Sequence, residues 1–177
     1  QAIHGQPITL APPTASLHQW AQQAERAVPE LRTHVSESAD TPEALVGVTP
    51  LRVDHHTGPM TDAHAATVEV CLTTEHTEAL LRRAPAAYRT QINDLLLAGL
   101  ARAVQEWTGA DRVLVDVEGH GRTGPLDLSR TIGWFTSEFP VALDLPTDQD
   151  WGRVLKSVKE QLRAMPHRGL SYGALRW

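Results

Sequence analysis

The chain has 177 residues, of which 41% are hydrophobic, and its formal net charge at pH 7 is −5. This composition is ordinary for a folded domain and excludes a wholly disordered chain. No apolar run is long enough to cross a bilayer, and no dense run of Lys and Arg favours a nucleic-acid surface. The single cysteine, Cys71, cannot form an internal disulfide, so we expect a cytoplasmic protein.

The first predicted element is a helix that starts after Ser16. Ser16 and Gln19 have the spacing of a capping box, and apolar residues then recur at helical intervals. Pro29 is expected to end this helix or to follow its end closely. Residues 33–64 are rich in Pro, Ser, Thr, Asp and Gly without periodicity, which predicts a long surface connection.

Residues 66–72 alternate between apolar and polar types, which predicts a strand with one buried face. A short helix is expected at 75–83, stopped by Pro85. The strongest predicted helix spans about 90–107 and is ended by Gly109. Its apolar stripe consists of Ile92, Leu95, Leu96, Leu100, Ala103, Val104 and Trp107.

Two further strands are predicted, at 113–117 and at 139–145, and the second places Val141, Leu143 and Leu145 on one side. Asp150 is expected to cap a last helix, which Pro166 ends. The apolar positions of that helix are Val154, Leu155, Val158, Leu162 and Met165. Strands separated by helices predict an α/β fold, a layered sandwich with a mostly parallel or mixed sheet flanked by helices.

The strand at 113–117 ends in Glu118 and then in a turn with two glycines, Gly119-His120-Gly121. A carboxylate at the end of a rigid element, beside a tight and uncrowded turn, is a common way to mount a general acid or base. Alternation places Asp116 and Glu118 on one face of the strand. The alternative interpretation, a solvated strand end with ordinary acids, stays open on these residues alone.

Several motifs resemble those of the epimerization domains of non-ribosomal peptide synthetases, relatives of the condensation domains. Glu118–Arg122 is similar to the EGHGR signature of that family, and Arg130–Thr136 to RTxGWFT. Asn93–Ala98 resembles the helix motif that precedes them, and Pro166–Gly173 resembles PxxGxGYG, with Ser171 in place of a glycine. The stretch Thr14–Ala21 also fits, so the resemblance spans nearly the whole chain.

The resemblance implies a chloramphenicol-acetyltransferase-like two-layer sandwich lobe. Residues 1–32 would be the helical tail of an N-terminal lobe, 33–64 the connection, and 65–177 a C-terminal lobe truncated at its end. The implied reaction is L-to-D epimerisation of an aminoacyl or peptidyl thioester on the 4′-phosphopantetheine arm of a peptidyl carrier protein. No metal or nucleotide is implied, and neither a nucleic acid nor a membrane is an expected partner.

The resemblance also implies roles for single residues. Glu118 would be one of two acid/base groups that flank the substrate α-carbon. His120 or Arg122 would supply a hydrogen-bond donor to the developing enolate. Arg122 has an alternative role, a salt bridge to Asp116 or Glu118 that shapes the turn.

Two aromatic residues of the motifs that resemble the family's, Trp134 and Tyr172, are candidate substrate contacts. Trp134 and Phe135 are also expected to pack and to hold their loop against the strand. For Trp134 the packing role and the substrate role are therefore both open.

The second acid/base group of the family is the second histidine of HHxxxDG. His55 and His56 do not fit this motif, because Asp62 is displaced and no glycine follows it. A metal site at Asp54, His55, His56, Asp62 and His64 matches no familiar ligand spacing, so no metal is predicted.

We therefore expect the second group in a segment outside this chain, which alone would be inactive. The expected partners are the carrier protein, the remaining N-terminal lobe and neighbouring synthetase domains. Two alternatives remain, a carrier-docking or scaffold fragment and a relative of the peptide-bond-forming condensation domains.

Overall fold

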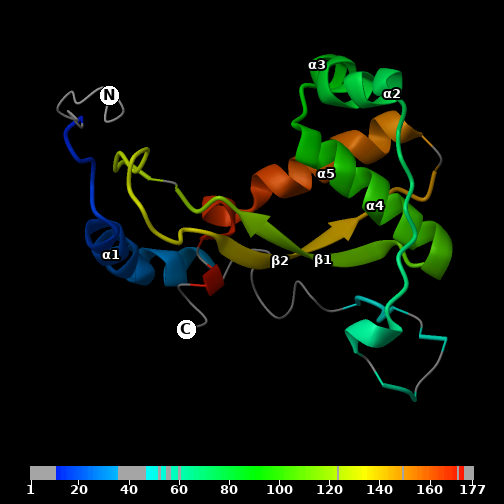
Figure 1. Ribbon diagram of the computed structural model, residues 1–177, viewed down its shortest axis with the longest axis horizontal. Helices are drawn as coiled ribbons and strands as arrows, with labels where there is room; N and C mark the ends of the chain where they lie inside the picture. The colour runs from blue at the N-terminus through cyan, green and yellow to red at the C-terminus, as the bar shows by residue number, and fades with distance from the viewer. Residues whose placement is uncertain are drawn as a thin grey trace, which may run out of the picture. The chain divides into compact units, whose positions relative to one another are not determined.

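A computed structural model describes residues 11–35, 47–51, 53–54, 57–59, 61–122, 124–148, 150–170 and 172–173. The elements in chain order are α1 (Leu17–Val35), η3 (Asp62–His64), α2 (Thr74–Glu78), η4 (Ala79–Arg83), α3 (Ala84–Tyr88), α4 (Ile92–Thr108), β1 (Arg112–Gly119), β2 (Ser137–Asp144), α5 (Trp151–Ala164) and η5 (Pro166–Gly169) (Figure 1). No helix among these described residues is long and apolar enough to span a membrane.

The chain folds as two compact units. The first unit comprises Gln1–Asp40, Asp116–Phe139 and Pro166–Trp177, and the second unit comprises Thr41–Val115 and Pro140–Met165. Strands β1 and β2 form an antiparallel pair (Figure 1). The α/β class is confirmed, and within the described residues the sheet is this one antiparallel pair rather than the mostly parallel or mixed sheet that the order of strands and helices predicted.

The second unit has an apolar core between its strand residues and its helices. Leu143 of β2 and Val158 of α5 are fully buried, and Val141 is 2% exposed. The side chain of Asp150 accepts a hydrogen bond from the N–H of Gly152 at 2.8 Å, which caps the start of α5. The predicted face of the second strand and the predicted cap of the last helix are both confirmed.

Helix α4 packs against α5 through a face that the apolar stripe predicted only in part. Leu95 is buried as expected, but the fully buried residues are Ala98 and Ala101, whereas Leu100 and Trp107 are 49% and 56% exposed. Small side chains allow two helix backbones to approach closely, so here size outweighs hydrophobicity in choosing the contact face. The predicted end of the helix is confirmed, because Gly109 adopts a φ of 74° at the C-cap.

Of the three predicted helix stops at proline, the one at Pro166 is confirmed, because α5 ends at Ala164, and the other two are wrong. Helix α1 continues through Pro29 to Val35, because a proline removes one hydrogen bond and the flanking Ala, Glu, Leu and Arg residues favour a helix. Pro85 lies in the first turn of α3, directly after the π-helical turn η4, in which the N–H of Ala84 donates to the carbonyl of Ala79. The hydrogen-bond register changes there, and the helical path from α2 runs on past the proline.

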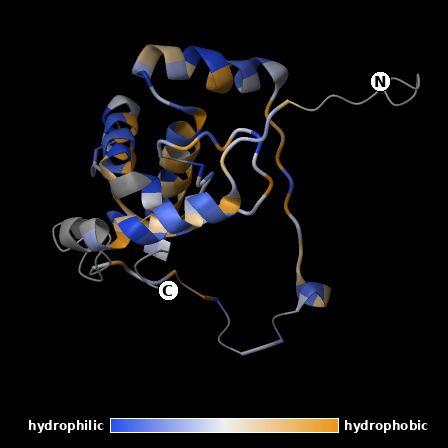
Figure 2. Ribbon diagram, turned by 90° about the vertical axis from the view of Figure 1, so that its left-hand side faces the viewer, coloured by the Kyte–Doolittle hydropathy of each residue, from blue (hydrophilic) through white to orange (hydrophobic). Residues whose placement is uncertain are grey.

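The strand predicted at 66–72 is also wrong. Residues 65–73 are in no regular element, and Val68 and Val70 are 90% and 85% exposed. Figure 2 shows orange and blue alternating along this segment, which leads from η3 to α2. Alternation of apolar and polar residues is compatible with a strand, but a strand also needs a neighbouring strand to bond with. In the described part of the chain, only β1 and β2 pair.

Candidate active site

Strand β1 presents Glu118 to solvent at its C-terminal end. Leu114, Asp116 and Glu118 are exposed, while Val115 and Val117 on the other face are half-buried. The strand is longer than predicted and includes Glu118 and Gly119, and the predicted common face of Asp116 and Glu118 is confirmed. The carboxylate of Glu118 is therefore held on regular backbone and is open to a substrate.

The turn after Glu118 is crowded at both glycines. A Cβ at Gly119 would lie 2.6 Å from the Oγ of Ser137. Gly121 has a φ of 68°, and a Cβ there would overlap the backbone carbonyl of Phe135. The turn thus lies directly against the backbone that enters β2, which explains why it carries glycine at both positions.

Ser137 is a residue of this site that the sequence did not indicate. Its Oγ is buried beside Gly119 and makes no hydrogen bond within the described part of the chain. Only its position directly after RTIGWFT links it to a motif. A buried hydroxyl without a partner is unusual, and this one lies beside the residue that follows Glu118.

Arg122 joins the EGHGR turn to the loop that follows it. One terminal nitrogen donates to the carbonyl of Leu128 at 2.6 Å and to that of Thr131 at 2.9 Å. The guanidinium carbon lies 4.1 Å from the centre of the Phe135 ring. These contacts commit one face and one end of the guanidinium to the loop.

The salt bridge from Arg122 to a neighbouring carboxylate, expected as one alternative, is wrong. Across the described ranges, no ion pair joins Arg122 to Asp116 or Glu118. Backbone carbonyls and an aromatic face take its place, so Arg122 shapes the turn by a different set of partners than the sequence indicated.

The RTIGWFT segment buries one aromatic residue and exposes the other. Phe135 is 3% exposed, which confirms its packing role, whereas Trp134 is 83% exposed, so its predicted packing role is wrong. Successive side chains of an extended segment point in opposite directions, so burying Phe135 turns Trp134 outward. Ile132, two residues earlier, is 97% exposed. The segment therefore offers two apolar side chains to a partner.

The loop that Arg122 binds is braced by its own polar contacts. The Ser129 hydroxyl and backbone N–H donate to Asp127 Oδ1 at 2.7 Å and 3.0 Å. The two hydrogen bonds lower the pKa of the Asp127 carboxyl below its ordinary value of 3.8. The bond from the hydroxyl has the larger effect.

The remaining predicted residues are Tyr172 and the two histidines of the connection. Tyr172 is half-buried in the last described helical turn. His55 and His56 lie outside the described residues. Among the residues that the structure describes, no group of three or more His, Cys, Asp or Glu side chains is placed to hold a metal ion.

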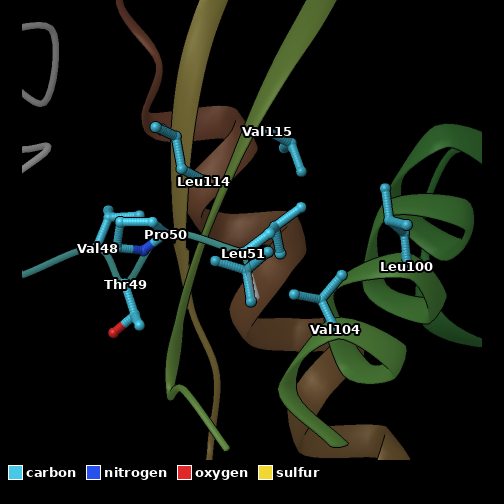
Figure 3. Close-up of a pocket in the computed structure, with 9 residues that line it drawn as sticks. Val48, Thr49, Pro50, Leu51, Leu100, Val104, Leu114 and Val115 are labelled. Atoms are coloured by element: carbon cyan, nitrogen blue, oxygen red, sulfur yellow. The ribbon is translucent and has the colours of Figure 1, made fainter. Parts of the chain in front are cut away.

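The second unit contains an apolar cavity of about 350 Å³ (Figure 3). Leu51 lines it together with Leu100 and Val104 of α4 and residues 113–115 of β1. None of the described residues that line this cavity is titratable, so it offers no group for proton transfer. The turn from Glu118 to Arg122 remains the candidate site.

Comparisons with known proteins agree with this fold. The epimerization domain from the third module of tyrocidine synthetase B superposes with a TM-score of 0.85 at 38% identity, over 99% of this chain and 40% of that chain. The first condensation domain of the calcium-dependent antibiotic synthetase, in complex with a substrate analogue, superposes with a TM-score of 0.71 at 23% identity, over 99% of this chain and 37% of that chain. The fold is thus the chloramphenicol-acetyltransferase-like α/β class that these domains share.

The family follows from the sequence match. The model of the condensation domain family matches residues 12–177, and the chain belongs to this family. It is 44% identical to chondramide synthase cmdD of Chondromyces crocatus, over 98% of this chain and 4% of that protein. It is 38% identical to tyrocidine synthase 2 of Brevibacillus parabrevis, over 99% of this chain and 5% of that protein. The chain therefore spans a small part of the synthetases that it resembles.

Proposed function

We propose that this chain takes part in the epimerisation, from L to D, of an aminoacyl or peptidyl thioester carried on the phosphopantetheine arm of a peptidyl carrier protein. The observation that carries the proposal is the exposed carboxylate of Glu118 at the end of β1, beside a turn that is crowded at both glycines. The 38% identity with a solved epimerization domain supports it.

The reaction requires a proton to leave one face of the α-carbon and another to arrive on the opposite face. Glu118 is the acid/base group on one face. An imidazole from another part of the synthetase serves the opposite face. Negative charge develops on the thioester oxygen between these steps, and exposed His120 donates a hydrogen bond to it. Arg122 supports the site by holding the turn.

Trp134 and Tyr172 contact the substrate or its pantetheine arm in this proposal. The high exposure of Trp134 leaves its ring free for such a contact. Residues up to 32 belong to the end of an N-terminal lobe, 33–64 to the connection and 65–177 to the C-terminal lobe. The partners are the carrier protein, the rest of the domain and neighbouring synthetase domains, in the cytoplasm.

The test replaces Glu118 with glutamine in the full-length protein and measures exchange of the substrate α-proton with solvent deuterium. The substrates are L-aminoacyl thioesters loaded on the carrier protein. Glu118→Gln removes the acid/base group with little change in volume, so exchange is expected to stop. Asp116→Asn is the matched control, because Asp116 is exposed on the same face of β1, and it is expected to keep wild-type exchange. Wild-type exchange by Glu118→Gln contradicts the proposal.

The same assay separates epimerisation from peptide-bond formation, which the family name and the condensation-domain fold leave as the neighbouring activity. A donor and an acceptor aminoacyl carrier are supplied together and the products are analysed. A D-configured thioester supports the proposal, whereas a peptide thioester without α-proton exchange contradicts it.

A further inference from the structure

The buried ring of Phe135 contacts two segments that are far apart in the sequence. Trp20 of α1 meets the ring edge-to-face, with centroids 5.1 Å apart and planes at 79°. The guanidinium of Arg122 lies 4.1 Å from the centre of the same ring. Both geometries are favourable, the first between aromatic rings and the second between a cation and a ring face. Phe135 thus links the first helix to the turn that carries Glu118.

The backbone of Phe135 is coupled to the turn as closely as its side chain. Its carbonyl lies where a Cβ of residue 121 would be, and Gly121 is buried at a φ of 68°. The turn and this backbone cannot slide past each other independently, because the contact has no flexible side chain in it. A displacement of Phe135 therefore moves the residues that follow Glu118.

The start of α1 is tied to the same loop by a second set of contacts. The Ala15 N–H donates to the Asp127 carbonyl at 3.0 Å, and the Thr131 hydroxyl donates to the Ala15 carbonyl. Leu17 packs against Gly133, where a Cβ would lie 3.0 Å from it.

The capping box begins the helix at this point. Ser16 N–H donates to Gln19 Oε1 at 2.7 Å, and Gln19 N–H donates to Ser16 Oγ at 3.2 Å. The direction of α1, and with it the position of Trp20, is therefore set relative to the loop that Arg122 binds.

We propose that Trp20 is a positioning residue for Glu118, acting through Phe135 and Arg122. The inference rests on the proposed role of Glu118 as an acid/base group. Without the indole, the Phe135 ring gains space to tilt, its contact with Arg122 weakens, and the turn relaxes. Proton transfer requires the carboxylate within hydrogen-bonding reach of the α-carbon proton, and a misplacement of ~1 Å costs about 100-fold in rate.

The test uses the full-length protein and the deuterium-exchange assay with loaded carrier. Trp20→Ala is expected to lower kcat for exchange by about 10-fold or more and to change KM by less than about two-fold, because only the reacting group is displaced. Trp20→Phe keeps an edge for the Phe135 ring and is expected to restore kcat to within about three-fold of wild type.

Two control variants separate positioning from general loss of structure. Trp107→Ala removes an indole that is 56% exposed on α4 and is expected to leave exchange unchanged. Leu143→Ala destabilises the core of the second unit and is expected to leave kcat per folded molecule unchanged.

Thr131→Val serves as the second variant if Trp20→Ala does not fold. It removes the hydroxyl that donates to Ala15 and keeps the backbone carbonyl that accepts from Arg122. Its kcat is expected to fall without a change in KM. Wild-type kcat in a folded Trp20→Ala variant, or in Thr131→Val where Trp20→Ala does not fold, together with loss of exchange in Glu118→Gln, overturns the positioning role alone. Exchange that persists in Glu118→Gln instead overturns the proposed function.

Discussion

The core of the second unit and the Glu118 turn of the first unit are stabilised in different ways. In the second unit, Leu143, Val154 and Val158 are buried in apolar surroundings contributed by helices and a strand. In the turn, the closest contact is between backbone atoms, where Gly121 lies against the Phe135 carbonyl. Side chains of similar volume can replace one another in the core, but no residue other than glycine fits at position 121.

This difference indicates where the chain tolerates change. An apolar core responds to volume and hydrophobicity, so its residues have substitutes. A turn that brings two backbone segments together and holds an ionisable side chain accepts almost no substitutions. Four predictions test this contrast, from the largest expected effect to the smallest.

Gly121→Ala is expected to have the largest effect. Residue 121 has a φ of 68°, and its new Cβ would overlap the Phe135 carbonyl. The free energy of unfolding should therefore fall by more than about 4 kcal/mol. Gly109→Ala is the matched control, because Gly109 has a φ of 74° with open space around it, and it should cost only about 1 kcal/mol. If chemical denaturation shows the same loss of unfolding free energy in both variants, the backbone contact at Gly121 does not stabilise the turn.

Leu143→Ala tests the other side of the contrast. Leu143 is fully buried, and its truncation should lower the free energy of unfolding by about 2–5 kcal/mol. Leu143→Met keeps the volume and should cost less than about 1.5 kcal/mol. Denaturation midpoints of the two variants measure the difference. A methionine variant as unstable as the alanine variant would mean that this core is as intolerant as the turn.

Trp134→Ala is expected to change stability by no more than about 0.5 kcal/mol, because the ring is 83% exposed. Its proposed contact with the substrate predicts a higher KM for the loaded carrier instead. Phe135→Ala, at the neighbouring buried position, should lower stability by about 3–5 kcal/mol. Thermal melts and exchange kinetics of the two variants check this, and an unchanged KM in Trp134→Ala removes the substrate role.

The smallest expected effect is the pH dependence of the stability that the Asp127 carboxyl contributes. Hydrogen bonds from Ser129 lower the pKa of this carboxyl, so its contribution to stability is present above the unfolded value near 3.8 and is lost as pH falls through the lower folded value. The loss of unfolding free energy caused by Asp127→Asn should therefore become smaller below about pH 4. Chemical denaturation of Asp127→Asn and of the wild-type protein at pH 7 and at pH 3 measures this loss. A stability difference between the two proteins that grows on acidification contradicts the prediction.

Local patterns predicted the elements whose signals lie within a few residues. The capping box at Ser16, the glycine end of α4, the Asp150 cap and the buried face of β2 all follow from short-range hydrogen bonding and periodicity. The strand at 66–72 failed because pairing depends on a neighbouring strand, which the local pattern does not report. The helix stops at Pro29 and Pro85 failed because one proline did not outweigh the helical residues and geometry around it.

The site divides in the same way. The motifs located Glu118 at a strand end beside a glycine turn, because strand alternation and turn chemistry are local properties. Only the tertiary structure decided what Arg122 binds, since its partners lie six and nine residues further on and no charge pattern marks a carbonyl. The link from Trp20 to Phe135 also belongs to the tertiary structure, because spacing along the chain does not report which buried surfaces meet.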